Sequence, residues 1–433
     1  MDDGHGAPSD SSSEPSRGFA EPTAGTGPGR ARFAVRLRRF AILWHRYVGL
    51  AISGVILVAG VTGVPLAFEE ELDAWLNPEL FEAHPETPGR AMLSPFEVRR
   101  RALPQLPEGM KLRSVRFAVE PGHAAKVFAK DENGLYRQWF LDPYTGEVLG
   151  SRSWGDISEG MKNLMPFIYR LHYSLGLGIA GAAVFGLAAF LWTFDCFFAM
   201  YLTFPPPRKE GSEAKRRSWV SRWKPAWLVK ATKLFSFVFT WHRASGLWIW
   251  GFLLIFAWSA VSVNLPPVYR PIMNAILGME VVGHESLPQL EPPFPEPKLT
   301  LEAALERGEA EMAREASERG FEVGAPQQIY WAADHGVYGY VVESSLDISL
   351  KRPWTEVYID GQTGDFVGFT APTGIAAGNT FSSWILALHM GVVFGTWYRV
   401  VVALMGVLVS VLSVTGVWVW WKKRTRRTSR PKP

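Results

Sequence analysis

Four histidines stand near the starts of apolar, helix-length segments, and their neighbours match in two pairs. His45 and His242 are each followed by arginine and then, four residues on, by glycine. His172 and His389 each follow a leucine and have glycine six residues on. An ionisable ring at a recurring place in membrane helices indicates a functional site, and imidazoles that face each other across a helix bundle are typical ligands of haem iron. We therefore predict haem binding by all four histidines.

The rise of a helix predicts which histidines share an iron. His45 lies ~34 Å from Phe68 along a helix that rises roughly 1.5 Å per residue, so histidines at opposite ends of the helices cannot meet. We expect an inner pair, His45 with His242, and an outer pair, His172 with His389, each holding one haem. The chain has a single cysteine, which excludes a Cys-x-x-Cys-His attachment motif, so both haems are expected to be haem b.

Two axial imidazoles leave no open position on the iron for oxygen chemistry, which favours electron transfer. A zinc or copper site is less favoured, because two imidazoles leave a tetrahedral site short of ligands. The simplest alternative is that these are interfacial histidines hydrogen-bonded to loop carbonyls, or that they follow the helix start by descent alone. The pattern identifies no catalytic residue.

Four arginines and one acid accompany the histidines. Arg46 and Arg243 directly follow the inner pair, and Arg170 and Arg399 lie near the outer pair. A guanidinium can bind a haem propionate through two hydrogen bonds, so all four are predicted cofactor-binding residues. The alternative for the two inner arginines is anchoring of helix ends at the lipid headgroups. Asp195 is the one acid inside its apolar segment, and we expect it to pair with an arginine.

Glycines near the ligands have two open interpretations. They can let a flat porphyrin lie against the backbone, or they can let helices pack closely, as small residues commonly do in membranes. These glycines are Gly49, Gly246, Gly176, Gly178, Gly391 and Gly395.

The elements that position these residues are predicted to be four transmembrane helices and two extracytoplasmic α+β domains, in an α-helical membrane protein. Crossing a bilayer takes roughly 20 apolar residues, and four segments meet that length. The predicted order is a disordered cytoplasmic tail, then helix, outer domain, helix, basic loop, helix, outer domain, helix and basic tail. Their ranges are 1–29, 36–68, 69–167, 168–203, 204–233, 234–264, 265–383, 384–421 and 422–433.

The orientation follows from the basic residues, because short cytoplasmic loops retain Lys and Arg. Basic residues crowd the stretches 30–39, 208–233 and 422–432. Both termini and the middle loop are therefore expected in the cytoplasm. Nucleic-acid binding is the rival interpretation, but the position of these runs beside every inner helix end favours topology. Trp219, Trp223 and Trp227, at four-residue spacing, predict a segment lying on the inner leaflet among lipid.

The last helix is too long for a simple span. From His389 to Trp421 the helix would extend ~48 Å, whereas a hydrocarbon core is about 30 Å thick. Either the outer histidine rides on an extension above the lipid, or the helix breaks near Gly395 and Thr396. In both cases the outer haem is expected close to the extracytoplasmic domains.

The two halves of the chain repeat. Asp142 and Asp360 open the same Asp-x-x-Thr-Gly pattern between two apolar runs, and their separation matches that of His172 and His389 to within one residue. The pattern is typical of a turn whose aspartate accepts backbone hydrogen bonds, which we favour over acid catalysis or metal binding. Amphipathic helices are predicted before the strands, at Ser94 to Leu106 and at Thr300 to Arg319. Strands are expected around Phe117, Val119, Val127, Phe128, Ile329 to Trp331 and Val337 to Val342.

Several of these segments resemble the PepSY-associated transmembrane family. They are His45 to Leu50, Gly60 to Gly63, Phe68 to Asp73 and Leu76 to Pro78 for the first helix, both Asp-x-x-Thr-Gly hairpins, and Leu388 to Gly391, Thr415–Gly416 and Trp420 to Lys423 for the last helix. The resemblance implies a multi-pass protein of the bacterial inner membrane. Its members include reductases of iron-loaded siderophores. The chain departs from the pattern at Asp195 and at Val64–Pro65.

The expected function is electron transfer outward across the membrane. The donor is membrane quinol or a separate cytoplasmic reductase, because no Gly-x-Gly-x-x-Gly nucleotide motif or flavin domain occurs. By resemblance, the acceptor is an extracytoplasmic ferric chelate such as a ferrisiderophore, so the chain is expected to be a haem-dependent ferric reductase for iron uptake. One alternative is a non-enzymatic membrane protein that binds peptides or regulates a peptidase. Another is a transporter that moves a substrate between the repeats.

Overall fold

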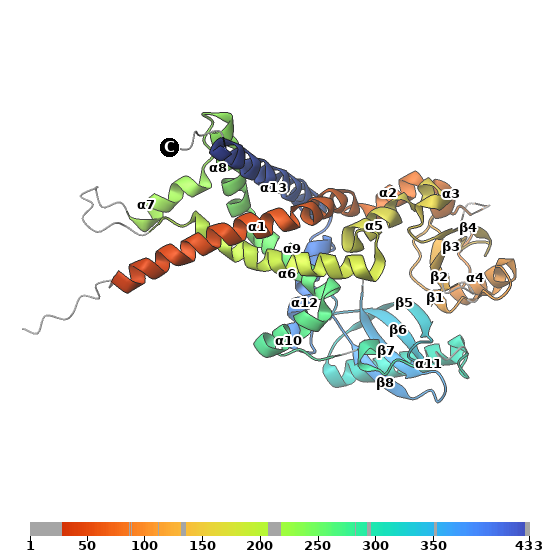
Figure 1. Cartoon of the computed structure of the whole chain (residues 1–433). Coiled ribbons are helices and arrows are strands. Elements are labelled where there is room, and N and C mark those ends of the chain that lie inside the picture. The colour runs from red at the N-terminus through yellow and green to blue at the C-terminus, as the bar shows by residue number, and fades with distance from the viewer. Residues whose placement is uncertain are drawn as a thin grey trace, which may run out of the picture.

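A bundle of long helices occupies one end of the molecule, and two β-sheets occupy the other (Figure 1). The computed structural model describes residues 28–428, except 86, 88, 111, 131–135, 207–217, 282, 292–295 and 350–352. Most of the predicted tail at 1–29, the basic run at 208–217 and residues 429–433 lie outside the described residues. The last two residues of that predicted tail begin the first helix.

Within the described ranges, three helices are long and apolar enough to cross a membrane, or four if one bent pair forms a single span. The three are α1 (Pro28–Leu66), α6 (Gly178–Thr203) and α13 (Thr396–Thr428). The bent pair is α8 (Leu234–Trp248) and α9 (Trp250–Asn264), which meet at 69°. The chain is therefore a membrane protein with β-sheet domains.

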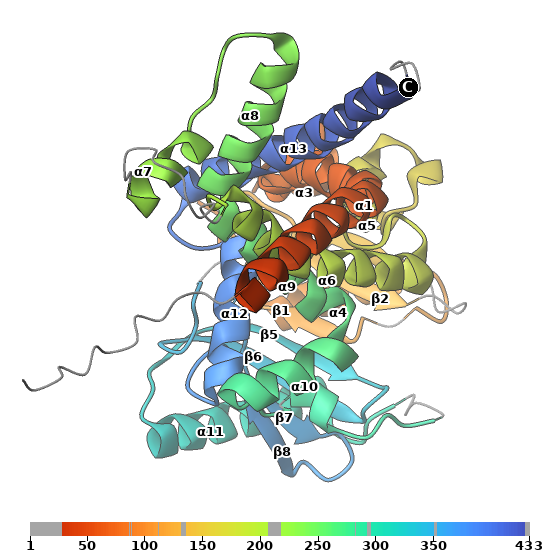
Figure 2. The same ribbon diagram turned by 60° about the vertical axis from the view of Figure 1, so that its left-hand side comes forward.

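The chain returns towards the sheets through the bent pair. Both sheets lie at the same end of the bundle, and α6 carries the chain away from them (Figure 1). At the far end lie α7 (Trp219–Trp223) and the 3₁₀ helix η4 (Lys224–Trp227), and α8 contacts α13 there (Figure 2). Since the second sheet again lies beside the first, α8 and α9 together must bring the chain back.

The tryptophans of α7 and η4 form a continuous row of ring contacts. The ring centroids of Trp219 and Trp223, and of Trp223 and Trp227, are 5.1 Å apart, and Trp227 contacts Trp248 of α8 at the same distance. This row fixes the segment against α8. That it lies on the membrane surface stays a prediction.

Two predicted helices are broken where they reach the sheets. Segment 168–203 divides into α5 (Leu164–Ser174) and α6, and segment 384–421 divides into α12 (Ala377–Met390) and α13. The predicted last helix was too long for a simple span, so it required either a break or an extension above the lipid. The structure has the break. The residues at the two breaks have the left-handed backbone that glycine favours. They are Gly176, Gly178, Gly391 and Gly395, with φ of 71°, 60°, 69° and 75°, and the non-glycine residues Leu175 and Phe394.

The helices α1 and α13 cross in close backbone contact. A Cβ atom on Gly60 would lie 2.5 Å from Oγ of Ser410 and 2.9 Å from the carbonyl oxygen of Gly406. Such approach requires small residues on both helices. The crossing holds the two longest helices of the bundle together between the inner and outer histidine pairs.

The sheets are antiparallel, and one strand from the first half of the chain belongs to the sheet formed by the second half. The first sheet has the order β2-β3-β4 and the second the order β1-β5-β6-β7-β8. The strands are β1 (Ser114–Arg116), β2 (Ala125–Lys130), β3 (Tyr136–Leu141), β4 (Val148–Ser153), β5 (Val323–Ala332), β6 (Val337–Ser344), β7 (Thr355–Asp360) and β8 (Phe366–Thr370). In β1, Val115 pairs with Ile329 and packs in the core of the second sheet. The two predicted outer domains therefore share a sheet and are not separate.

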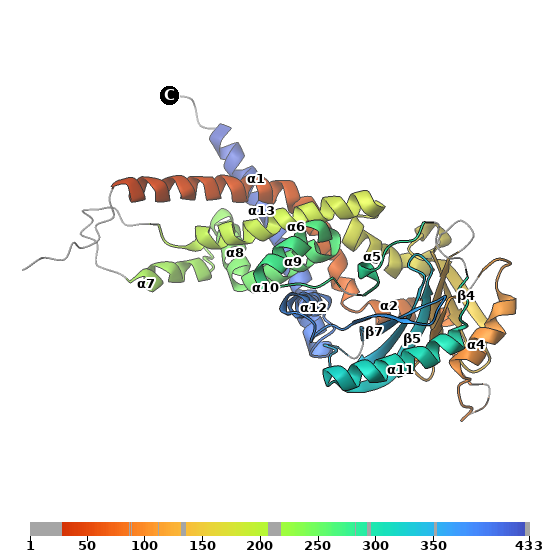
Figure 3. The same cartoon turned by 90° about the horizontal axis from the view of Figure 1, so that it is seen from below.

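The local predictions for these domains are confirmed. Ser94 caps α4 (Pro95–Ala102), and Thr300 caps α11 (Leu301–Arg319), which lies along the second sheet (Figure 3). Asp142 accepts hydrogen bonds from two backbone amides of its turn, and Asp360 does the same in the second turn. The turn glycines have φ of 79° and 80°. Only the strand predicted around Phe117 and Val119 is wrong, because β1 ends at Arg116.

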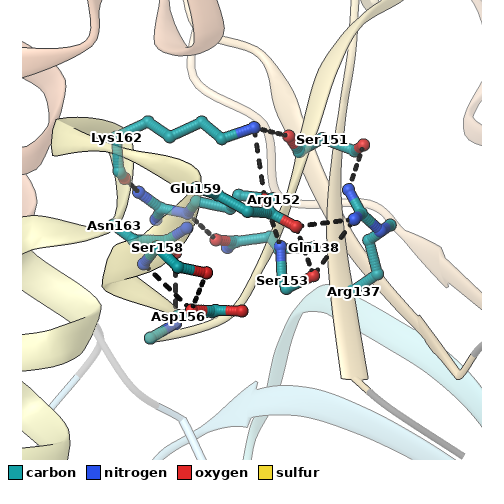
Figure 4. Close-up of polar contacts among 11 residues, drawn as sticks. Arg137, Gln138, Ser151, Arg152, Ser153, Asp156, Ser158, Glu159, Lys162 and Asn163 are labelled. Carbon is teal, nitrogen blue, oxygen red and sulfur yellow. Dashed lines mark hydrogen bonds and ion pairs between the residues drawn. The ribbon is translucent and has the colours of Figure 1, made fainter.

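A buried ion pair ties the first sheet to the membrane helices. Asp73 of α2 (Glu69–Leu76) binds Arg152 of β4 through both oxygens, at 2.9 and 2.6 Å. Arg152 also donates to the carbonyl of Lys162, in the turn that leads into α5, and Figure 4 shows these two residues beside Glu159. The remaining short helices are α3 (Pro78–Phe81), η1 (Leu103–Gln105), η2 (Ile157–Glu159), η3 (Met161–Asn163), α10 (Pro266–Leu277) and η5 (Gly283–Ser286).

Candidate functional site

The four histidines form two facing pairs. In the inner pair, the ring centroids of His45 on α1 and His242 on α8 are 6.3 Å apart, with their planes at 49°. In the outer pair, those of His172 on α5 and His389 on α12 are 6.1 Å apart, with their planes at 74°. All four side chains are partly buried. The fold thus brings together the histidines that the sequence paired.

Each histidine ring has a side-chain hydrogen-bond partner among the described residues, and in every case the ring atom is Nδ1. In the outer pair, Thr62 of α1 lies 3.0 Å from Nδ1 of His172, and Ser259 of α9 lies 2.6 Å from Nδ1 of His389. In the inner pair, Thr415 of α13 lies 3.0 Å from Nδ1 of His242. The fourth ring, His45, has a carboxylate partner: the oxygens of Asp195 on α6 lie 3.1 and 2.9 Å from Nδ1.

These partners determine which ring nitrogen carries the proton. A hydroxyl has a single proton, and each of the three hydroxyls donates its own to a carbonyl one turn back on its helix. With its proton on that carbonyl, each hydroxyl accepts from Nδ1–H in the tautomer that keeps the lone pair on Nε2. An ionised Asp195 can only accept, so His45 has the same tautomer. The three carbonyl bonds are Thr62 to Val58 at 2.6 Å, Ser259 to Ile255 at 2.7 Å and Thr415 to Val411 at 2.7 Å.

The expectation that Asp195 pairs with an arginine is wrong. Within the described residues, its hydrogen bonds and its ion pair are all with His45. A buried carboxylate on a membrane helix is costly unless a donor compensates it, and the imidazole N–H supplies that donor.

Glycine beside a histidine ring leaves room for the ring in two places. A Cβ atom on Gly63 of α1 would lie 3.2 Å from Cε1 of His172, and one on Gly416 of α13 would lie 3.3 Å from Cε1 of His242. Each of these glycines directly follows the threonine that binds the same ring. The Thr-Gly dipeptide therefore provides both an acceptor and the space for an imidazole.

The two imidazole nitrogens of each pair suit a metal ion whose other ligands come from a cofactor. Each pair offers two Nε2 lone pairs, and within the described residues no group of three or more His, Cys, Asp or Glu side chains could hold a metal. An imidazole nitrogen binds a transition metal at roughly 2.0–2.1 Å, so two rings on opposite sides of one ion have centroids roughly 6 Å apart. The observed centroid distances of 6.3 and 6.1 Å match that spacing. Haem iron, with four ligands from its porphyrin, suits such a site.

In two of the four predicted arginines, the side-chain hydrogen bonds all go to backbone carbonyls. Arg243 donates to the carbonyls of Pro225 and Ala226 in η4, at 2.6 and 3.2 Å. Arg170 donates to the carbonyl of Gly155 at 3.1 Å. Both guanidinium groups therefore have a role in holding neighbouring segments.

The other two arginines differ from each other. Arg399 binds Glu71 with two of its nitrogens and donates to the carbonyl of Ala67 at 2.7 Å. Arg46 makes no hydrogen bond or ion pair with a described residue, and its charge is close enough to interact with that of Lys423 on α13. Arg46 is therefore the arginine best placed to bind an anionic group beside the inner pair. Propionate binding by any of the four stays a prediction.

The hydroxyl partners were not predicted from the sequence, although a signal for them exists. Thr62 and Ser259 are separated by the same number of residues as His45 and His242, so they occupy the same position in the two halves. A Thr-Gly dipeptide also occurs in both α1 and α13.

The two interpretations of Gly49 and Gly246 both stay open. A Cβ atom at these glycines would come no closer than 3.9 and 3.7 Å to a neighbouring helix.

A comparison with family models identifies the family of the chain. A model described as "PepSY-associated TM region" matches residues 42–423, and this range contains all four histidines and their partners. The chain belongs to this family. No curated protein matches the chain. The PepSY-associated assignment confirms the resemblance seen in the sequence and agrees with the apolar helices and the sheets.

Proposed function

We propose that this protein is an electron carrier with two b-type haems that reduces an extracytoplasmic ferric chelate, a ferrisiderophore, for iron uptake. The observation that supports it most is the presence of two facing imidazole pairs, each ring held through Nδ1 with Nε2 available. Metal-binding histidines almost always have such a partner on their other nitrogen. Four rings arranged in this way favour ligands over interfacial histidines.

The inner pair is proposed to lie towards the cytoplasm and the outer pair towards the sheets. The basic residues favour this orientation, with both termini and α7 in the cytoplasm, both sheet domains outside in the bacterial inner membrane, and four spans from a duplicated ancestor. Thr62, which binds the outer pair, lies ~25 Å along α1 from His45 at the standard helix rise. An electron therefore crosses the membrane in steps, by way of the two centres.

Each bound haem supplies a one-electron centre, and the chain's own residues hold it in place. With both imidazoles of a pair bound to a haem iron, no position would remain for dioxygen, and the hydroxyl and carboxylate partners would fix the ring orientation. Arg46 and Lys423 place positive charge beside the inner pair, where propionates need a counterion. Reduction weakens a siderophore complex because hard oxygen ligands hold Fe(III) far better than Fe(II). The electron donor is quinol or a cytoplasmic reductase.

An absorption spectrum of the purified protein tests the cofactor. We expect a low-spin b-type spectrum with two haems per chain, and its absence contradicts the proposal. Protein reconstituted in vesicles with an internal reductant should then reduce a ferric hydroxamate added outside, measured by capture of Fe(II). A variant lacking both outer histidines is the control, and equal rates in the two preparations argue against outward electron transfer.

One observation favours the alternative function of peptide binding. A cavity of about 270 Å³ lies between α4, β1 and β2, with a mostly apolar lining that includes Leu93, Val115 and Val127. An apolar cavity of this kind can accept a side chain of a bound peptide. Peptide binding by a haem-free protein that tolerates His172→Ala would support this function instead.

A further inference from the structure

The partners of the four histidines are not chemically equal. Three are neutral hydroxyls, on α1, α9 and α13, whereas His45 alone binds a carboxylate, Asp195. The inner pair therefore has one carboxylate and one hydroxyl, and the outer pair has two hydroxyls. The two pairs, which otherwise match, therefore differ in the charge of their hydrogen-bond partners.

Asp195 is buried and directed at one atom. Its exposed fraction is 6 %, and both of its oxygens lie within hydrogen-bond distance of Nδ1 of His45. Gly49, one turn beyond His45 on α1, lies beside Oδ2, since a Cβ atom there would be in ordinary contact with it at 3.9 Å. No Lys or Arg side chain of the described residues forms an ion pair with Asp195. Its charge therefore acts on His45.

A carboxylate changes the ring that it binds more than a hydroxyl does. By accepting the Nδ1–H bond, it draws the proton towards itself and leaves more electron density on Nε2, which makes the ring a stronger donor to a metal. A stronger donor, together with a nearby negative charge, stabilises Fe(III) relative to Fe(II) and so lowers the reduction potential. A hydroxyl that already donates to its own helix contributes less.

We infer that Asp195, acting through His45, sets the reduction potential of the inner haem below that of the outer haem. An electron that enters at the inner centre then moves downhill to the outer one, so the direction of transfer is built into the helices. This inference rests on the proposed dihaem function. It identifies Asp195 as a positioning residue and not as a ligand.

Redox titration of single-haem variants tests the order of the potentials. His389→Ala leaves only the inner haem, and His242→Ala leaves only the outer haem. We expect the inner potential to be lower, by at least a tenfold difference in the equilibrium constant of reduction, or roughly 59 mV for one electron. An inner potential equal to or above the outer one overturns the inference.

Asp195→Asn in the complete protein tests the cause. Asparagine keeps an acceptor oxygen but removes the charge, so we expect the inner potential to rise by a similar amount and the outer one to stay unchanged. Asp195→Glu, which restores the charge, should bring the potential back, and Thr415→Val on the other ring of the inner pair should shift it less. Unchanged potentials in Asp195→Asn with both haems bound overturn the inference and leave the dihaem function intact. A wild-type protein without haem contradicts the proposed function instead.

Discussion

The inner and outer histidine pairs present similar rings but are held by different parts of the molecule. The inner pair is built from α1 and α8, and its partners come from α6 and α13, all within the helix bundle. The outer pair is carried by α5 and α12, the two short helices that join the sheets to the bundle. The geometry of the outer pair therefore depends on the folded sheets, whereas that of the inner pair depends on helix packing alone.

The first sheet reaches the outer pair through a short chain of contacts. Asp73 and Arg152 are both buried, and Arg152 donates to the carbonyl of Lys162, just before α5. Lys162 in turn donates to the carbonyl of Ser151 on β4 (Figure 4). His172 lies on the α5 helix that starts there. A change at this cluster should alter the geometry of the outer pair and leave that of the inner pair unchanged.

Removing one ligand gives the largest expected effect and separates the two sites. His389→Ala should lose the outer haem and keep the inner one, because no other described side chain can replace the ligand. His242→Ala should do the reverse. The haem-to-protein ratio should fall by about half in each variant, as measured by the pyridine haemochrome spectrum. Loss of both haems from a single change, or of neither, contradicts the pairing.

Filling the space beside a ring is the next largest change. Gly63→Leu should displace the ring of His172 and lower the occupancy of the outer haem, since even a Cβ atom there lies only 3.2 Å from Cε1. Gly416→Leu should act in the same way on the inner haem. Gly54→Leu on α1 is the matched control, because a Cβ atom at Gly54 meets nothing within 4 Å. Equal losses in Gly63→Leu and Gly54→Leu would show that helix insertion, and not the ring, is affected.

Breaking the buried ion pair should weaken the outer site selectively. Arg152→Met leaves the carboxylate of Asp73 buried and unpaired, which costs roughly 3–5 kcal/mol of stability. We expect the outer haem to be released at a lower temperature than in the wild type, with the inner haem unchanged, as followed by the two absorption signals on heating. The double variant Asp73→Leu with Arg152→Met should recover part of the loss. Parallel release of both haems would contradict separate support of the two pairs.

Acid should first destabilise the region that supports the outer pair, through protonation of Glu159. Burial works to raise the pKa of Glu159, but hydrogen bonds from Ser153 and Lys162 and the charge of Arg137 outweigh it and lower the pKa to about 2. Because the unfolded carboxyl has a pKa of 4.5, the stabilisation is complete above that pH and is lost as the pH falls from about 4.5 to about 2. Glu159→Gln should flatten the decrease in melting temperature over this range. Glu108→Gln, at an exposed position, is the control and should leave the decrease unchanged.

Local patterns predicted the features that depend on local chemistry. The helices that begin at Ser94 and Thr300 and the two aspartate turns follow from residues that are close in sequence. The histidine pairing follows from helix length and from the matching sequences around the histidines. Comparing helix length with bilayer thickness required either a break near Thr396 or an extension above the lipid, and the structure has the break. These features need no knowledge of distant contacts.

The features that were missed depend on distant contacts. Nothing around Val115 indicates that it pairs with Ile329, because the pairing of strands far apart in the sequence leaves no local pattern. Hydroxyls such as Thr62 commonly bind their own helix, so their second bond to a histidine is not visible in the sequence. The 69° bend between α8 and α9 falls at Ile249, between Gly246 and Gly251, and no proline marks it.

The pairing of β1 with β5 imposes an order on assembly. Val115 is synthesised long before Ile329, and the two strands are separated by the helices α6, α8 and α9. β1 therefore finds its partner only after these helices and β5 itself have been made, and contacts of such long sequence separation form late. Until then, β1 has an open edge. The second sheet takes its first strand from the first half of the chain, so that half can be completed only after the helices α6, α8 and α9 and the strand β5 have been made.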